Sequence, residues 1–116
     1  MCYSHQKRNF INDHLSYAKI IAIVLTSDKA DVQSIDGIRL STMHRAKGLE
    51  FKAVAIPFMS AADFPPKAVF KSVVDDADRE DKEAQMRSLL HVAATRAKAF
   101  LRVSWSGQPS SFLNHD

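Results

Sequence analysis

Residues 41–51, STMHRAKGLEF, gather side chains that are suited to binding a phosphate or a nucleotide. Thr42 and His44 can donate hydrogen bonds to phosphate oxygens, and Glu50 can accept hydrogen bonds from a sugar or hold a metal-bound water. Gly48 lacks a side chain, which lets the backbone approach a ligand closely. Taken singly, His44 also fits a surface histidine in a loop, and Glu50 is better explained as an ordinary exposed residue. Their density between two apolar runs favours a bound ligand.

Arg96 is a second candidate, within the segment VAATRAK at residues 92–98. Its neighbours are small, so a helix can pack closely here while the guanidinium reaches outward. The planar guanidinium suits bidentate contact with a phosphate. A cation near a helix C-terminus is an equally good interpretation, because it interacts favourably with the helix dipole by about 0.3–1 kcal/mol.

Several other kinds of site are not indicated. The Lys47-Gly48 pair is reminiscent of phosphate-binding loops, but the pattern G-x-x-x-x-G-K-[ST] is absent, so this chain does not provide the primary triphosphate cradle. Cys2 and His5 are too small a set for zinc, and the five histidines show no ligand spacing. No metal site is therefore predicted. The G-x-S-x-G turn of serine hydrolases is also absent.

Helices and strands alternate along the chain, which predicts an α/β fold with a mostly parallel sheet and flanking helices. Thr42 and His44 then follow the carboxyl end of a strand, where such sheets bind ligands. One helix should carry an apolar stripe that includes Met86 and Leu89. The expected helices are residues 9–19 and 75–99, the expected strands are 20–25 (buried on both faces), 38–42, 53–58 and 100–105, and the expected loops are 26–36 and 60–74.

Length and composition fit one globular domain or part of one: 116 residues, 46% hydrophobic and 25% charged. The net charge of +3 is unevenly distributed, because basic segments at 39–52 and 87–102 flank an acidic one at 75–83. Basic segments that meet in space would attract phosphate or nucleic acid. On charge alone, ordinary solvated faces are the better interpretation. The only cysteine is Cys2, and no apolar run is long enough to cross a membrane. The expected location is the cytoplasm, with no membrane partner.

Two longer strings resemble the C-terminal motor region of superfamily 1A helicases, the UvrD/Rep/PcrA/RecB-like group. LSTMHRAKGLEFKAV at residues 40–54 resembles their motif V. MRSLLHVAATRAKAFLRVS at residues 86–104 contains a string that resembles their motif VI. The resemblance covers about residues 38–105 and implies a partial RecA-like domain, the second motor domain of such enzymes.

The resemblance also implies roles for individual residues. Arg96 would be the arginine finger that reaches the γ-phosphate of ATP. Gly48 and Glu50 would line the nucleotide. Thr42 and His44 would contact the backbone of single-stranded DNA, with the nearby cation Arg45 added to this surface. The implied partners are single-stranded DNA and a first RecA-like domain that carries the P-loop. ATP and Mg²⁺ would bind in the complete helicase, and neither is expected to bind tightly to this chain.

The family pattern is incomplete here. His91 and Ala94 stand where the family usually has Tyr and Leu, and no P-loop or acidic pair for magnesium is present. We therefore expect a part of a larger helicase that is inactive by itself. The expected organisation is a lead-in at residues 1–37, a RecA-like core at 38–106 and a tail at 107–116. The alternative is a non-catalytic module that kept the fold and binds nucleic acid or a partner protein.

Overall fold

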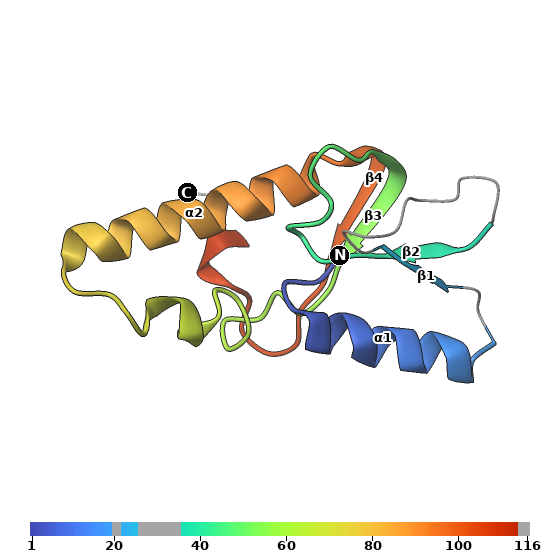
Figure 1. Ribbon diagram of the computed structural model, residues 1–116, viewed down its shortest axis with the longest axis horizontal. Helices are drawn as coiled ribbons and strands as arrows, with labels where there is room; N and C mark the ends of the chain where they lie inside the picture. Colours follow the sequence, from blue (N-terminus) through green and yellow to red (C-terminus); the bar gives the residue numbers. More distant parts are fainter. Residues whose placement is uncertain (20–21, 26–35, 114–116) are drawn as a thin grey trace.

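The computed structural model describes residues 1–19, 22–25 and 36–113, and Figure 1 shows their arrangement. Ile20 and Ile21 of one predicted strand, most of the predicted loop 26–36 and the last residues of the predicted tail lie outside the described residues. The elements in chain order are α1 (His5–Tyr17), β1 (Ala22–Val24), β2 (Ile38–Leu40), β3 (Phe51–Ile56), the 3₁₀ turn η1 (Lys67–Phe70), α2 (Asp76–Ala94), β4 (Ala97–Val103) and the 3₁₀ turn η2 (Ser111–Leu113).

The described strands form two parallel pairs, so the predicted α/β class with parallel pairing is confirmed. In the first pair Ala22 of β1 lies opposite Ile38 of β2. In the second pair Ala53 of β3 lies opposite Phe100 of β4, after a register shift near the start of β3. Pro57 directly follows β3, in agreement with the expectation that a proline stops this strand.

Residues 1–3 connect the two pairs. The Cys2 amide donates to the Ser41 carbonyl at 2.9 Å and the Met43 amide donates to the Cys2 carbonyl at 2.8 Å, which continues the parallel pairing beyond β2. On the other side the Met1 nitrogen donates to the Ala55 carbonyl of β3 at 2.6 Å. Burial raises the pKa of the Cys2 thiol, so this side chain stays protonated inside the sheet.

The main core lies between α2 and one face of the β3–β4 pair. α2 begins after Asp75, whose carboxylate accepts a hydrogen bond from the Asp78 amide at 2.8 Å. Its predicted apolar stripe is present, because Met86 and Ala93 are buried against the side chains of Val54 and Ile56. The whole buried cluster comprises Met43, Val54, Ile56, Met59, Phe64, Met86 and Ala93.

The predicted C-terminal boundary of this helix is wrong. Residues 75–99 were expected to be helical, but α2 ends at Ala94 and β4 begins at Ala97, earlier than the expected residue 100. The sequence here is rich in good helix formers and has no Gly or Pro to end a helix. Pairing with β3 overrides that local preference, since the Phe51 amide donates to the Arg96 carbonyl at 2.8 Å. Arg96 therefore lies in the turn between α2 and β4.

The first helix also differs from its expected range of 9–19. α1 begins at His5, because the Ser4 hydroxyl accepts a hydrogen bond from the Lys7 amide at 3.2 Å and so caps the helix. Residues 5–8 carry no apolar repeat, so the hydrophobic pattern could not place this start. α1 packs on β1, whose three residues are half-buried and not buried on both faces as expected.

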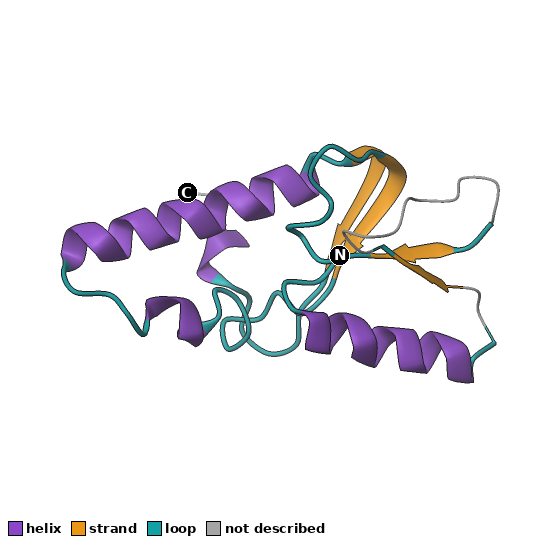
Figure 2. Cartoon of the chain, in the orientation of Figure 1, coloured by secondary structure: helices purple, strands orange, loops and turns teal. Residues whose placement is uncertain are grey.

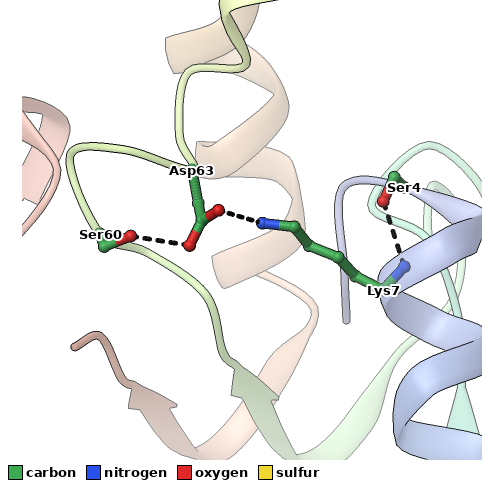
Figure 3. A network of polar contacts seen from close by, with 4 residues as sticks. All are labelled: Ser4, Lys7, Ser60 and Asp63. Atoms are coloured by element: carbon green, nitrogen blue, oxygen red, sulfur yellow. Dashed lines mark hydrogen bonds and ion pairs between the residues drawn. The ribbon is translucent and has the colours of Figure 1, made fainter.

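The segment after β3 leaves the sheet and returns through η1 to α2 (Figure 1). Lys7 of α1 forms an ion pair with Asp63 of this segment at 2.7 Å, and the Ser60 hydroxyl donates to the same carboxylate at 2.8 Å (Figure 3). These two contacts hold the pKa of Asp63 below its ordinary value. The loop after β3 is thereby fixed against the N-terminal helix.

The described part of the expected tail packs on the same segment. The Ala61 amide donates to the Gln108 carbonyl and the Ser110 amide donates to the Met59 carbonyl, both at 2.8 Å. Ser110 is completely buried, and the Phe112 ring contacts the Phe64 ring edge to face. Residues 108–113 therefore belong to the folded body.

Candidate functional site

The polar passage at residues 41–51 forms a compact turn followed by the start of β3. Thr42 begins the turn, and its carbonyl accepts hydrogen bonds from the Arg45 and Ala46 amides at 3.2 Å each. The Thr42 hydroxyl lies 3.4 Å from the Arg45 amide, which donates to it. Thr42 is only 6% exposed, whereas His44 is exposed on the surface of the turn. The hydroxyl of Thr42 is thus used to shape the turn.

His44 and Lys47 face a groove of about 660 Å³ between this turn and α2. The helix contributes polar side chains at Asp81, Gln85 and Ser88, but most of the exposed lining of this groove is apolar. The His44 ring packs edge to face against the Tyr3 ring, with centroids 5.4 Å apart. Tyr3 therefore fixes one side of the imidazole while the other side remains exposed.

Gly48 ends the turn with a φ of +83°, in the left-handed region. A Cβ atom built at this position would meet nothing within 4 Å. The glycine is thus required by the backbone conformation, since other residues populate this region at a cost. The expectation that a ligand approaches the Gly48 backbone stays a prediction.

Pairing between β3 and β4 brings Glu50 next to Arg96. The two residues precede the first residues of neighbouring parallel strands, and the Phe51 amide donates to the Arg96 carbonyl at 2.8 Å. Glu50 and Lys98 form an exposed ion pair at 3.5 Å. Motifs V and VI, which are far apart in sequence, therefore meet at one end of the β3–β4 pair.

The Arg96 side chain is oriented by the end of α2. Its Nε donates to the Val92 carbonyl at 3.1 Å, and Nη2 donates to the Thr95 hydroxyl at 3.3 Å. The Thr95 hydroxyl in turn donates to the same Val92 carbonyl at 3.0 Å. A guanidinium has five N–H donors, so three are left that can bind an anion.

Three residues that support this site were not among the predicted site residues. Lys98 pairs with Glu50, Thr95 holds Arg96, and Tyr3 packs on His44. Lys98 and Thr95 both lie within the segment that resembles motif VI, so the motif could have indicated them. Tyr3 has no such signal, because its position depends on the placement of residues 1–3 beside Met43.

A metal-binding cluster and a membrane-spanning helix are both absent from the described residues. Within that part of the chain, no group of three or more His, Cys, Asp or Glu side chains is arranged to hold a metal ion. None of the described helices is long and apolar enough to span a membrane.

Residues 4–108 match the family described as UvrD-like helicase C-terminal domain. The chain belongs to this family. A probable DNA helicase II homolog of Mycoplasma genitalium is 40% identical over 103 residues, which cover 83% of this chain and 14% of the relative. The ATP-dependent DNA helicase PcrA of Staphylococcus epidermidis is 36% identical over a 116-residue alignment, which covers 90% of this chain and 14% of the relative.

The fold is similar to that of a solved structure, the C-terminal domain of a possible DNA helicase from Lactobacillus plantarum. The TM-score is 0.66 at 18% sequence identity, and the similarity covers 98% of this chain and 60% of the other. This similarity supports the fold. The chain spans only 14% of the length of the two helicases named above, so it corresponds to one part of such enzymes.

Proposed function

We propose that this chain supplies the second motor domain of a UvrD-like, ATP-dependent DNA helicase or translocase. In this proposal Arg96 is the arginine finger, and Gly48 and Glu50 lie beside the nucleotide. The observation that carries the proposal is the meeting of Glu50 and Arg96 at the starts of β3 and β4. A nucleotide held by the P-loop of a separate first domain would approach the end of the β3–β4 pair at which both residues lie.

The nucleotide side of the proposal rests on charge and on a prearranged guanidinium. Arg96 is half-buried, and its Nε is bound to the end of α2, so the orientation of the fork is restricted before a ligand binds. Such preorganised donors stabilise charge that develops on the transferred phosphoryl group. Mg²⁺ would come with the ATP and be held by the first domain, because we assign no metal ligand to this chain.

The DNA side of the proposal rests on the turn at residues 42–48. We assign the phosphate contacts to His44 and Arg45, whereas buried Thr42 contributes by holding the turn in shape. The turn continues directly into Glu50 and β3. If DNA displaced this turn, Glu50 in the proposed nucleotide site would move with it, because only a short stretch of backbone connects them.

The test is the DNA-stimulated ATPase rate of an intact PcrA-like motor in which this chain replaces the matched domain. An arginine finger acts in the transition state, so Arg96→Ala should lower kcat far more than it weakens nucleotide binding. Arginine fingers in comparable enzymes contribute on the order of 10³–10⁵ in rate. Arg96→Lys should restore little, since an ammonium lacks the planar fork.

Arg79→Ala is the matched control, because Arg79 lies in the first part of α2 and packs over the Phe70 ring, away from Glu50. Its ATPase rate should equal that of the unmodified motor. Near-normal turnover in Arg96→Ala would reject the finger assignment and favour a module that binds nucleic acid or a protein without catalysis.

A further inference from the structure

A second groove, of about 890 Å³, opens on the side of the sheet opposite α2. α1 and β2 form one wall of this groove, and β3 with β4 forms its floor and other wall. Phe100 is 64% exposed and Ile38 is 46% exposed, which is unusual for large apolar side chains in a sheet. The apolar lining includes Ile11, Leu15, Ile38, Ala53, Ala55 and Phe100.

The strand register explains why this surface is apolar. Ala53 pairs with Phe100 and Ala55 pairs with Arg102, so these four side chains project from the same face of the β3–β4 pair. The opposite face, with Val54 and Ile56, is buried in the main core. Parallel strands are normally covered on both faces. Among the described residues, Met86 and Ala93 of α2 pack on one face of β3–β4, and α1 packs beside β1. Figure 2 shows that α2 reaches the strands with its C-terminal end.

The size of the side chains on this floor fits a helix. Ala53 and Ala55 leave a shallow strip in the middle of the groove, and Phe100 borders it. A helix could approach the backbone closely over the two alanines and bury its apolar stripe against Phe100 and Ile38. A single nucleic-acid strand would find mostly aliphatic surface here, whereas such strands bind by stacking bases on aromatic rings.

The charges at this groove indicate which charges a bound helix should carry. Lys52 and Arg102 line it, and neither takes part in an ion pair within the described residues. Glu50 also lines the groove, but its carboxylate already pairs with Lys98. The uncompensated charge at Lys52 and Arg102 is positive, which complements carboxylates on a ligand.

We propose that this groove binds an amphipathic α-helix of a partner polypeptide, with its apolar stripe on the β3–β4 face and acidic flanks toward Lys52 and Arg102. This is the helix-in-groove mode of protein recognition. The proposed contacts at Phe100, Lys52 and Arg102 are separate from the residues assigned to ATP and DNA, although Glu50 borders both the groove and the proposed nucleotide site.

The direct test uses the purified 116-residue chain and three labelled synthetic peptides. The first peptide has Leu at helical spacing and Glu on both flanks. The second keeps the Leu stripe but has Lys in place of every Glu, and the third keeps the composition of the first with the stripe scrambled. Fluorescence anisotropy should show saturable binding of the first peptide alone, weakened by added salt.

Two groups of variants identify the surface. Phe100→Ser should weaken the first peptide about tenfold, because it removes most of the apolar contact. The double variant Lys52→Glu with Arg102→Glu should lose the first peptide and gain the second, and these exposed positions tolerate the change without a folding defect. Trp105→Ser is the control, since Trp105 is 49% exposed but does not line the groove. It should bind like the unmodified chain.

Three results would overturn the proposal. The first is a failure of specificity: the first and second peptides bind equally, or binding of the first peptide is unchanged both in Phe100→Ser and in the double variant of Lys52 and Arg102. The second is a short oligothymidylate that binds in place of the first peptide and is lost in the same variants, which would make the groove a nucleic-acid site. The third is a dimer in sedimentation that Phe100→Ser dissociates, which would assign the groove to a second copy of this chain.

Discussion

Gly48 illustrates how one residue fixes the geometry of the proposed site. Its φ of +83° turns the chain between the exposed His44 region and β3, and the surrounding space is open. Substitution should therefore affect the backbone only, without a steric clash. The position of Glu50 follows from this turn, because only Leu49 separates the two residues.

We predict that Gly48→Ala destabilises the fold by about 1–2 kcal/mol, the cost of placing a Cβ in the left-handed region. Gly48→Asn should cost less, since Asn adopts this conformation more readily. Urea unfolding followed by circular dichroism measures both values. Equal stability of all three proteins would mean that the turn adopts another conformation in solution.

At the scale of elements, the contact between α1 and the loop after β3 depends on charge. Lys7 and Asp63 are 2.7 Å apart, with side chains that are 29% and 41% exposed. Exposed pairs of this kind contribute only about 0.2–1 kcal/mol. The Lys7 ammonium also lies 5.0 Å from the centre of the Phe58 ring, so the lysine contacts this loop twice.

We predict a pH dependence for this contact. The bond to Lys7, followed by the bond to Ser60, lowers the pKa of Asp63 below its ordinary value of 3.8. A lowered pKa in the folded state stabilises the fold above the unfolded value, and this gain is lost as the pH falls through the folded value. Asp63→Asn should therefore destabilise the chain at pH 7 and have no effect in strong acid.

Urea unfolding of four proteins checks this prediction: the unmodified chain, Asp63→Asn, Lys7→Met and the double variant. The cycle separates the ion pair from the other contacts of Lys7. A coupling free energy that is unchanged between pH 7 and pH 2 would contradict an ionic contact.

The elements show which parts of the fold can be predicted from sequence. Strand and helix order followed from local patterns, and Asp75 correctly indicated the start of α2. The end of α2 could not be predicted in this way, because residues 95–99 have a local preference for helix that is overridden by pairing with β3. The same holds for the site. The motifs indicated Glu50 and Arg96, whereas their position at the same end of the β3–β4 pair depends on the strand register.

At the scale of the whole molecule, segments from both ends of the described chain meet at Phe64. Its ring is 1% exposed and contacts the Tyr3 ring at 6.1 Å and the Phe112 ring at 5.7 Å between centroids. No local sequence pattern indicates this meeting, because Tyr3 and Phe112 are distant in sequence from the loop that carries Phe64. Tyr3 also contacts His44, so the cluster reaches the proposed DNA surface.

We predict that Phe64→Ala destabilises the chain by about 3–5 kcal/mol, through lost burial and the cavity that remains. That is a large part of the 5–15 kcal/mol typical of a whole domain. Phe64→Leu should cost less, because a smaller cavity remains. Phe10→Ala is the control: Phe10 is 53% exposed, so its loss should cost much less. Urea unfolding measures all three.

We predict that Phe64→Leu also changes the proposed DNA surface, because the aromatic cluster supports His44. In Phe64→Leu, which keeps the fold, Tyr3 loses the edge of the ring that holds it, and Tyr3 in turn fixes one side of His44. The ring resonances of His44 should therefore shift in the NMR spectrum of Phe64→Leu and stay in place in Phe10→Ala. A shift in neither variant would mean that His44 is positioned by the turn at residues 42–48 alone, independently of the core beneath it.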